Sequence, residues 1–87
     1  MSAPGGGALR LTLYGRSYCH LCEDMRIQLE SLPGLPPFEV HWVDVDASPD
    51  LEARYGERVP VLVHAGRELC HFFLDVPAVT AYLHSIR

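Results

Sequence analysis

The chain contains no lysine, so its seven basic residues are all arginines, and its formal net charge at pH 7 is −4. The arginines are scattered between Arg10 and Arg87 and form no basic stripe. Phosphate backbones and anionic lipid surfaces are bound by clustered positive charge, which this sequence does not offer. The chain also has no apolar run near the ~18 residues that a membrane span needs. We therefore expect neither a nucleic-acid nor a membrane partner.

Cysteine is also scarce, with three residues in a chain of 87. Three cysteines cannot build the disulfide framework of a small secreted domain. A close pair, Cys19 and Cys22, with a distant third, Cys70, is typical of a reducing compartment. The N-terminal stretch MSAPGGGA lacks the basic and apolar regions of a secretory signal. We predict a flexible leader over residues 1–8, a single domain over residues 9–87, a cytoplasmic location and a monomeric state.

Hydrophobic periodicity predicts an alternation of strands and helices. Residues 9–14 (LRLTLY) alternate apolar and other side chains with a period of two, as in a strand, and Gly15 ends it. From Leu21, apolar residues recur every three or four positions until Pro33, which predicts a helix that the cysteine pair opens. A second strand is predicted over residues 38–45. A strand, a helix and a strand in this order imply a parallel pair of strands.

Further elements are predicted in the second half of the chain. Ser48 is a suitable N-cap for a short helix over residues 49–55, with proline at its first position, stopped by the glycine that follows. Residues 59–72 are predicted to form two short antiparallel strands around the turn Ala65-Gly66-Arg67. A last helix starts at Asp75, and the apolar residues expected on its buried side are Val79, Tyr82, Leu83 and Ile86.

The Cys-x-x-Cys spacing of Cys19 and Cys22 occurs in zinc sites and in redox dithiols, and two such cysteines can also be merely buried. A structural zinc site needs four ligands, and the only candidate for a second pair is Cys70-His71. These two neighbours point to opposite faces of a strand unless the strand ends or bulges there. A helix start favours the redox dithiol, because unpaired N–H groups and the helix dipole stabilise a thiolate at Cys19.

The positions of the two cysteines predict different roles. Cys19 lies just before the helix and Cys22 one turn inside it, so we expect Cys19 to be the nucleophile and Cys22 the resolving cysteine. We expect the Cys19 pKa to lie below the free-thiol value of ~8.5, with the helix terminus as the first cause. Arg16 and His20 add positive potential, whereas the two acidic residues that follow Cys22 oppose it.

Two segments, YCHLC (18–22) and YGERVPVLVHAGREL (55–69), resemble the small glutaredoxin-like proteins of the thioredoxin-like superfamily, and the resemblance covers residues 9–86. It implies an α/β fold of the thioredoxin-like, glutaredoxin type: β-α-β-α-β-β-α, with a four-stranded mixed sheet flanked by three helices. It also implies a cis peptide bond before Pro60, which costs an X-Pro bond only ~0.5–1 kcal/mol. Val59 and Pro60 would then form the substrate-facing wall opposite Cys19.

The same resemblance implies a thiol–disulfide oxidoreductase that acts on protein disulfides or glutathione mixed disulfides. We expect its partners to be disulfide-containing or glutathionylated proteins and glutathione as a cosubstrate, with no bound cofactor or metal. Typical glutaredoxins have Gly-Gly after the fourth strand for the glutathione γ-glutamyl end, where this chain has LCHFFLD (69–75). Between the cysteines they have Pro-Tyr, where this chain has His-Leu. The residues expected to contact substrate are Arg16, Tyr18, His20, Arg58, Val59 and Pro60, and Asp75 offers a further contact.

Two other functions stay open. Cys19, with an external thiol or a second subunit, could bind an iron–sulfur cluster or zinc, and Cys70-His71 extends that option. Alternatively, the domain could be a non-catalytic interaction module in which the dithiol is incidental. Cys70 is a candidate third thiol for exchange with the pair, or else a strand cysteine packed under the last helix.

Overall fold

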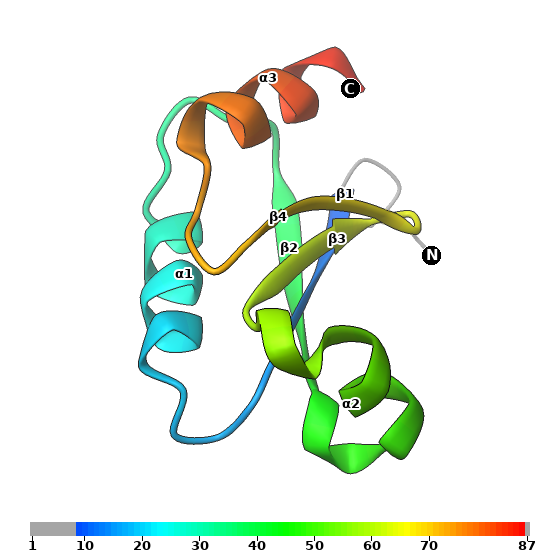
Figure 1. Ribbon diagram of the computed structural model, residues 1–87. Coiled ribbons are helices and arrows are strands. Elements are labelled where there is room, and N and C mark those ends of the chain that lie inside the picture. Colours follow the sequence, from blue (N-terminus) through cyan, green and yellow to red (C-terminus); the bar gives the residue numbers. More distant parts are fainter. Residues whose placement is uncertain (1–8, 87) are drawn as a thin grey trace, which may run out of the picture.

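A mixed four-stranded sheet forms the middle layer of the computed structural model, which describes residues 9–86 (Figure 1). The strands lie in the order β2-β1-β3-β4. β1 (Leu9–Gly15) pairs in parallel with β2 (Phe38–Asp44) and antiparallel with β3 (Val61–His64). β3 in turn forms an antiparallel hairpin with β4 (Arg67–His71). The predicted mixed sheet is thereby confirmed, and the predicted leader over residues 1–8 lies outside the described residues.

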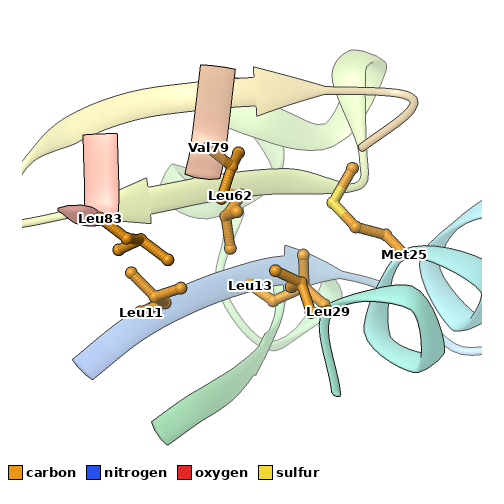
Figure 2. Close-up of a cluster of buried hydrophobic side chains, with 7 residues drawn as sticks. All are labelled: Leu11, Leu13, Met25, Leu29, Leu62, Val79 and Leu83. Atoms are coloured by element: carbon orange, nitrogen blue, oxygen red, sulfur yellow. The ribbon is translucent and has the colours of Figure 1, made fainter. Parts of the chain in front are cut away.

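Helices cover both faces of this sheet. α1 (His20–Glu30) and α3 (Val76–Ser85) lie on one face, and α2 (Pro49–Tyr55) lies on the other (Figure 1). Alternate residues of a strand point to the same face of the sheet. The face covered by α1 and α3 holds the main core. Figure 2 shows the seven buried side chains of this core: Leu11, Leu13, Met25, Leu29, Leu62, Val79 and Leu83.

The opposite face is anchored by an aromatic pair. Tyr14 points away from the main core and stacks on Tyr55 of α2, with ring centroids 4.1 Å apart. Burial and the neighbouring Tyr55 raise the pKa of Tyr14. This stack holds α2 against the sheet end at which β1 leads into the cysteine loop. None of the helices within residues 9–86 is long and apolar enough to cross a bilayer.

Several element boundaries differ from the sequence prediction. β1 continues through Gly15, and β2 ends one residue before Val45. The Asp44 side chain accepts a hydrogen bond from the backbone N–H of Asp46 (2.9 Å) and turns the chain into a short 3₁₀ helix, η2 (Val45–Ala47). Sequence periodicity gives no sign of so short a turn. A second 3₁₀ helix, η3 (Gly56–Arg58), continues directly from α2 and was not predicted.

The first helix is shorter than its apolar pattern. α1 begins at His20, because Cys19 caps it, and ends at Glu30 rather than at Pro33. The backbone N–H of Ser31 bonds to Gln28 O and Leu29 O and closes the last turn. Arg67, predicted to lie in the hairpin turn, is the first residue of β4.

Candidate redox site

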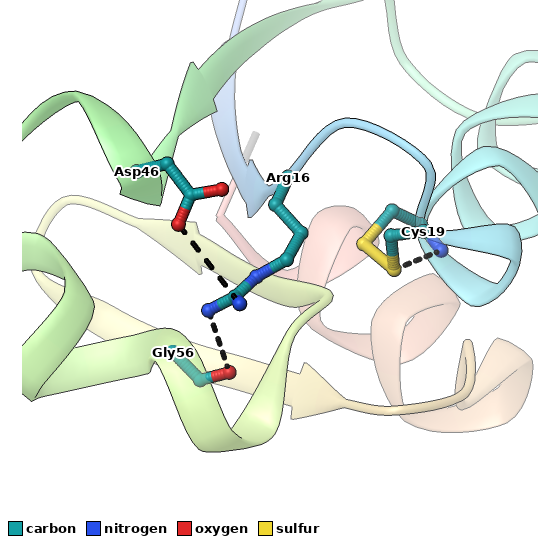
Figure 3. The surroundings of a disulfide bond; sticks show 5 residues. Arg16, Cys19, Asp46 and Gly56 are labelled. Atoms are coloured by element: carbon teal, nitrogen blue, oxygen red, sulfur yellow. Dashed lines mark hydrogen bonds and ion pairs between the residues drawn. A yellow bond between two sulfur atoms is a disulfide. The ribbon is translucent and has the colours of Figure 1, made fainter.

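A disulfide joins Cys19 and Cys22 at the start of α1, with the two Cα atoms 5.2 Å apart (Figure 3). Cys19 is the N-cap of the helix, and its Sγ accepts a hydrogen bond from the backbone N–H of Cys22 (3.1 Å). Cys19 is half-buried, whereas Cys22 is completely buried. Of the two cysteines only Cys19 is therefore partly accessible, and its sulfur is the one bound by a helix N-terminal N–H group.

Close packing behind Cys22 keeps its sulfur covered. A Cβ atom on Gly15 would lie 2.5 Å from Cη2 of Trp42 and 3.1 Å from Sγ of Cys22. The absence of a side chain at Gly15 thus lets the indole and the buried sulfur approach the same point. Trp42 is level with Leu13 in the parallel pairing of β1 and β2, which brings it to this end of the sheet. Sequence reasoning missed Trp42 as a site residue.

An open hollow with a volume of about 570 Å³ lies against Cys19. Volumes of this size suit small ligands or side chains. Its wall combines the loop between β1 and α1, two residues further along α1, and the indole of β2. The lining residues are Arg16, Ser17, Tyr18, Cys19, His20, Glu23, Arg26 and Trp42. The structure therefore brings three of the predicted substrate residues, Arg16, Tyr18 and His20, to one hollow with Cys19.

The guanidinium of Arg16 extends away from the disulfide, between Asp46 and Gly56 (Figure 3). It forms an ion pair with Glu52 (2.5 Å), donates to Gly56 O (3.2 Å) and lies 3.9 Å from Asp46 Oδ1. Two carboxylates therefore share the positive charge that was expected to act on Cys19. These contacts fix the cysteine loop to α2 and its neighbouring 3₁₀ helices.

Tyr18 and His20 flank Cys19 and are both exposed. Tyr18 has a positive φ of 62° and a fully exposed ring, so the loop presents this aromatic side chain to solvent immediately before the cysteine. His20 Nε2 lies 3.6 Å from Asp24 Oδ2, one helical turn further on. The Asp24 carboxylate thus competes with the Cys19 sulfur for the positive charge of a protonated His20.

The peptide bond between Val59 and Pro60 is cis, as the resemblance implies. The antiparallel register pairs Tyr14 with Val61. One residue further along this pairing, Pro60 therefore lies opposite Gly15. The buried sulfur of Cys22 lies next to this glycine. Arg58 turns away from this point, forms an ion pair with Glu68 and donates to Arg54 O (3.0 Å). Among the described residues, the wall of the Cys19 hollow includes neither Arg58 nor the Val-Pro step.

The model of a family described as Glutaredoxin-like domain (DUF836) matches residues 10–84. The chain belongs to this glutaredoxin-like family. It is similar to protein Ne2328 from Nitrosomonas europaea, with 39% identity and a TM-score of 0.79, over 95% of this chain and 99% of that one. It is also similar to protein XcR50 from X. campestris, with 38% identity and a TM-score of 0.66, over 88% of this chain and 99% of that one. We found no match among curated proteins.

The third cysteine of this glutaredoxin-like chain is separate from the Cys19 hollow. Cys70 pairs with Leu62 in the hairpin and packs, half-buried, against the main core. Burial raises the pKa of the Cys70 thiol, so the protonated, unreactive form is favoured. His71 is exposed and contacts Glu68 (2.9 Å). Within residues 9–86, no three His, Cys, Asp or Glu side chains cluster closely enough to hold a metal ion.

The segment after β4 has an unusual backbone in this glutaredoxin-like chain. Phe72 has a positive φ of 64°, and the N–H of Phe73 bonds to His71 O (2.7 Å), which makes a γ-turn centred on Phe72. The Phe72 N–H bonds to Pro60 O (2.9 Å) and ties this turn to the Val-Pro step. A bulky residue in this conformation is rare. Sequence reasoning identified the missing glycines here but not the turn.

Proposed function

We propose that this protein is a thiol–disulfide oxidoreductase in which Cys19 is the nucleophile and Cys22 the resolving cysteine. The observation that carries the proposal is the asymmetry of the pair: Cys19 is half-buried and lines an open hollow, whereas Cys22 is completely buried. Membership of the glutaredoxin-like family supports a redox role. The substrates we propose are protein disulfides or glutathione mixed disulfides.

The reaction uses only sulfur chemistry. The Cys19 thiolate attacks one sulfur of the substrate disulfide, a mixed disulfide forms, and the other substrate sulfur leaves as a thiolate that takes up a proton. The thiol of Cys22 loses its proton to solvent and attacks Cys19 Sγ, which releases the second substrate thiol. The substrate gains two electrons and two protons, and the protein loses them to become the Cys19–Cys22 disulfide. Two molecules of a thiol such as glutathione then reduce this disulfide by the reverse steps and leave joined as their own disulfide.

The start of α1 favours the first step. The Cys22 N–H that bonds to Cys19 Sγ in the disulfide is also in place for the thiolate, and the partial positive charge of the helix N-terminus acts on the same atom. The second step needs little motion, because the two Cα atoms are already at disulfide distance.

Trapping the intermediate tests the proposal. Reduced Cys22→Ser protein, mixed with a peptide disulfide, should accumulate a mixed disulfide at Cys19, because the resolving thiol is absent. Cys19→Ser should form none, with a loss of rate of at least about 1,000-fold, and Cys70→Ser should react like the unmodified chain. The measurement is intact mass followed by peptide mapping. Equal trapping at Cys19 and Cys70 would contradict the assignment, as would alkylation of Cys19 no faster than that of a free thiol at neutral pH.

A further inference from the structure

Two exposed phenylalanines and the half-buried Leu21 gather between α1 and the turn after β4. Leu21, Phe72 and Phe73, here called the Phe72 patch, line one narrow cleft of about 80 Å³ between α1 and the turn after β4. Phe72 is 40% exposed and Phe73 69% exposed. Soluble proteins seldom expose neighbouring large apolar side chains without a use for them.

The backbone holds this patch in place. The γ-turn at Phe72 puts a bulky residue into the left-handed region. Relative to glycine at this position, phenylalanine lowers the folding equilibrium constant by a factor of a few to about ten. The ring of Phe72 also packs edge-to-face against His71, with centroids 4.9 Å apart. Strain at an exposed aromatic residue is typical of functional segments rather than of ordinary turns.

The patch lies beside the first turn of α1, which carries the disulfide. Leu21 lies between Cys19 and Cys22 on the first turn of α1, and the turn after β4 is bonded to Pro60, which lies level with the buried side of the disulfide. A polypeptide whose cysteine reaches Cys19 Sγ can therefore lay its neighbouring residues over the patch. A patch of aromatic rings suits apolar side chains better than the charged ends of glutathione.

Carboxylates surround the patch. Asp24 lines the same cleft, and Asp75 and Glu68 line the hollow on the other side of Phe73. Within residues 9–86, Glu68 is paired with Arg58, whereas Asp24 has only the weak contact with His20 and the Asp75 carboxylate accepts only the cap bond of Ala78 N–H (3.1 Å). The free charge at the rim is therefore negative, which favours a basic residue in the partner.

We propose that the Phe72 patch binds an extended segment of a partner protein, with an apolar residue next to the reactive cysteine and a basic residue beyond it. This inference rests on the proposed function and names its substrate class: disulfides embedded in apolar, basic polypeptide rather than small disulfides.

Single-turnover kinetics with peptide disulfides test the proposal. Fully reduced protein is mixed with disulfide-linked dimers of two synthetic peptides, one with leucines beside the cysteine and a lysine beyond, the other with serines and a glutamate. The second-order rate constant of thiol release should be roughly tenfold higher for the leucine–lysine peptide, because part of an aromatic ring leaves water on binding. Phe73→Ser should remove most of this preference, and Phe73→Leu should keep it.

Matched controls separate the possible outcomes. Ile27→Ser removes another exposed apolar residue (56%) from α1 outside the patch and should leave the preference intact. Hydroxyethyl disulfide should react more slowly but equally with all variants, and failure of the unmodified protein to reduce any of the three disulfides would overturn the proposed function itself. Equal rates for both peptides, or an unchanged preference in Phe73→Ser, would overturn the role proposed for the Phe72 patch and leave the proposed function standing. If the unmodified chain forms a dimer and Phe73→Ser abolishes it, the patch binds a second copy of the chain instead, which would also overturn the proposal.

Discussion

The two sides of the first turn of α1 differ in what their side chains already bind. On one side, the Trp42 side, the indole packs over Gly15, and Arg26 donates to Glu23 at 2.8 and 3.1 Å. On the other side, the Phe72 side, two phenylalanines are exposed around a narrow cleft. Trp42 on the first side is 37% exposed and packs on a glycine beside the buried sulfur, whereas Phe73 on the second side is 69% exposed.

This difference separates two tasks. The Trp42 side protects the buried sulfur and gives shape to the hollow at Cys19, so changes there should be measured first in the stability of the fold. The Phe72 side contributes less to the fold and carries a strained turn, so changes there should be measured first in reactions with partners. A residue can therefore be assigned to one task by comparing the two measurements.

Truncation of the two aromatic residues gives the largest expected contrast. Trp42→Ala should lower the free energy of unfolding by about 2 kcal/mol, because the indole of this 37% exposed residue packs on Gly15 and its loss leaves a void beside Cys22. Phe73→Ala should lower it by less than about 0.5 kcal/mol. Denaturant unfolding of the oxidised proteins measures both values. Equal losses would remove the distinction between the two sides.

The strained turn predicts a smaller effect. Phe72→Gly should be more stable than Phe72→Ala by about 1 kcal/mol, because both remove the ring but only glycine accepts a positive φ without cost. At Phe73, where φ is not positive, the order should reverse, with alanine the more stable by a few tenths of a kcal/mol. Thermal unfolding of the four variants compares them directly. If alanine is the more stable at both positions, Phe72 is not strained in solution.

The smallest predicted effect is a change in the stability of the fold with pH, caused by Glu68 on the Phe72 side. The hydrogen bond from Arg58 is the main cause that holds the pKa of Glu68 below its usual range, and the contact with His71 adds to it. The folded-state pKa is thus lower than the unfolded one, so this pairing stabilises the fold above about pH 4.3 and the contribution is lost as the pH falls further.

The Glu68 side chain is a third exposed, so the loss should stay below about 1 kcal/mol. Urea unfolding between pH 3 and 6 should show it in the unmodified chain and not in Glu68→Gln. A slope of the same size in both proteins would assign the effect to other carboxylates.

The order and type of the helices and strands could be predicted from the sequence because apolar periodicity is a local signal. Met25 and Leu29, on the predicted helical stripe, are buried in the main core, and α3 buries Val79 and Leu83 as expected. The position of Cys19 at a helix start also followed from local pattern, and it is the N-cap of α1.

The rest of the site depends on contacts between distant residues. Trp42 reaches the disulfide only because the parallel register sets it opposite Leu13 and because the chain has glycine at Gly15. Arg16 was expected to act on Cys19, but its nearest carboxylate, Glu52, is 36 positions away in the sequence. Pairings of this kind are set by tertiary packing, which single-residue propensities do not contain.

The chain has one tryptophan, and its indole lies at the same glycine as the sulfur of Cys22. A disulfide in contact with an excited indole accepts an electron from it and suppresses its emission, whereas a pair of thiols does so far less. The ultraviolet fluorescence of the unlabelled protein therefore carries an optical record of whether the cysteine pair is oxidised or reduced.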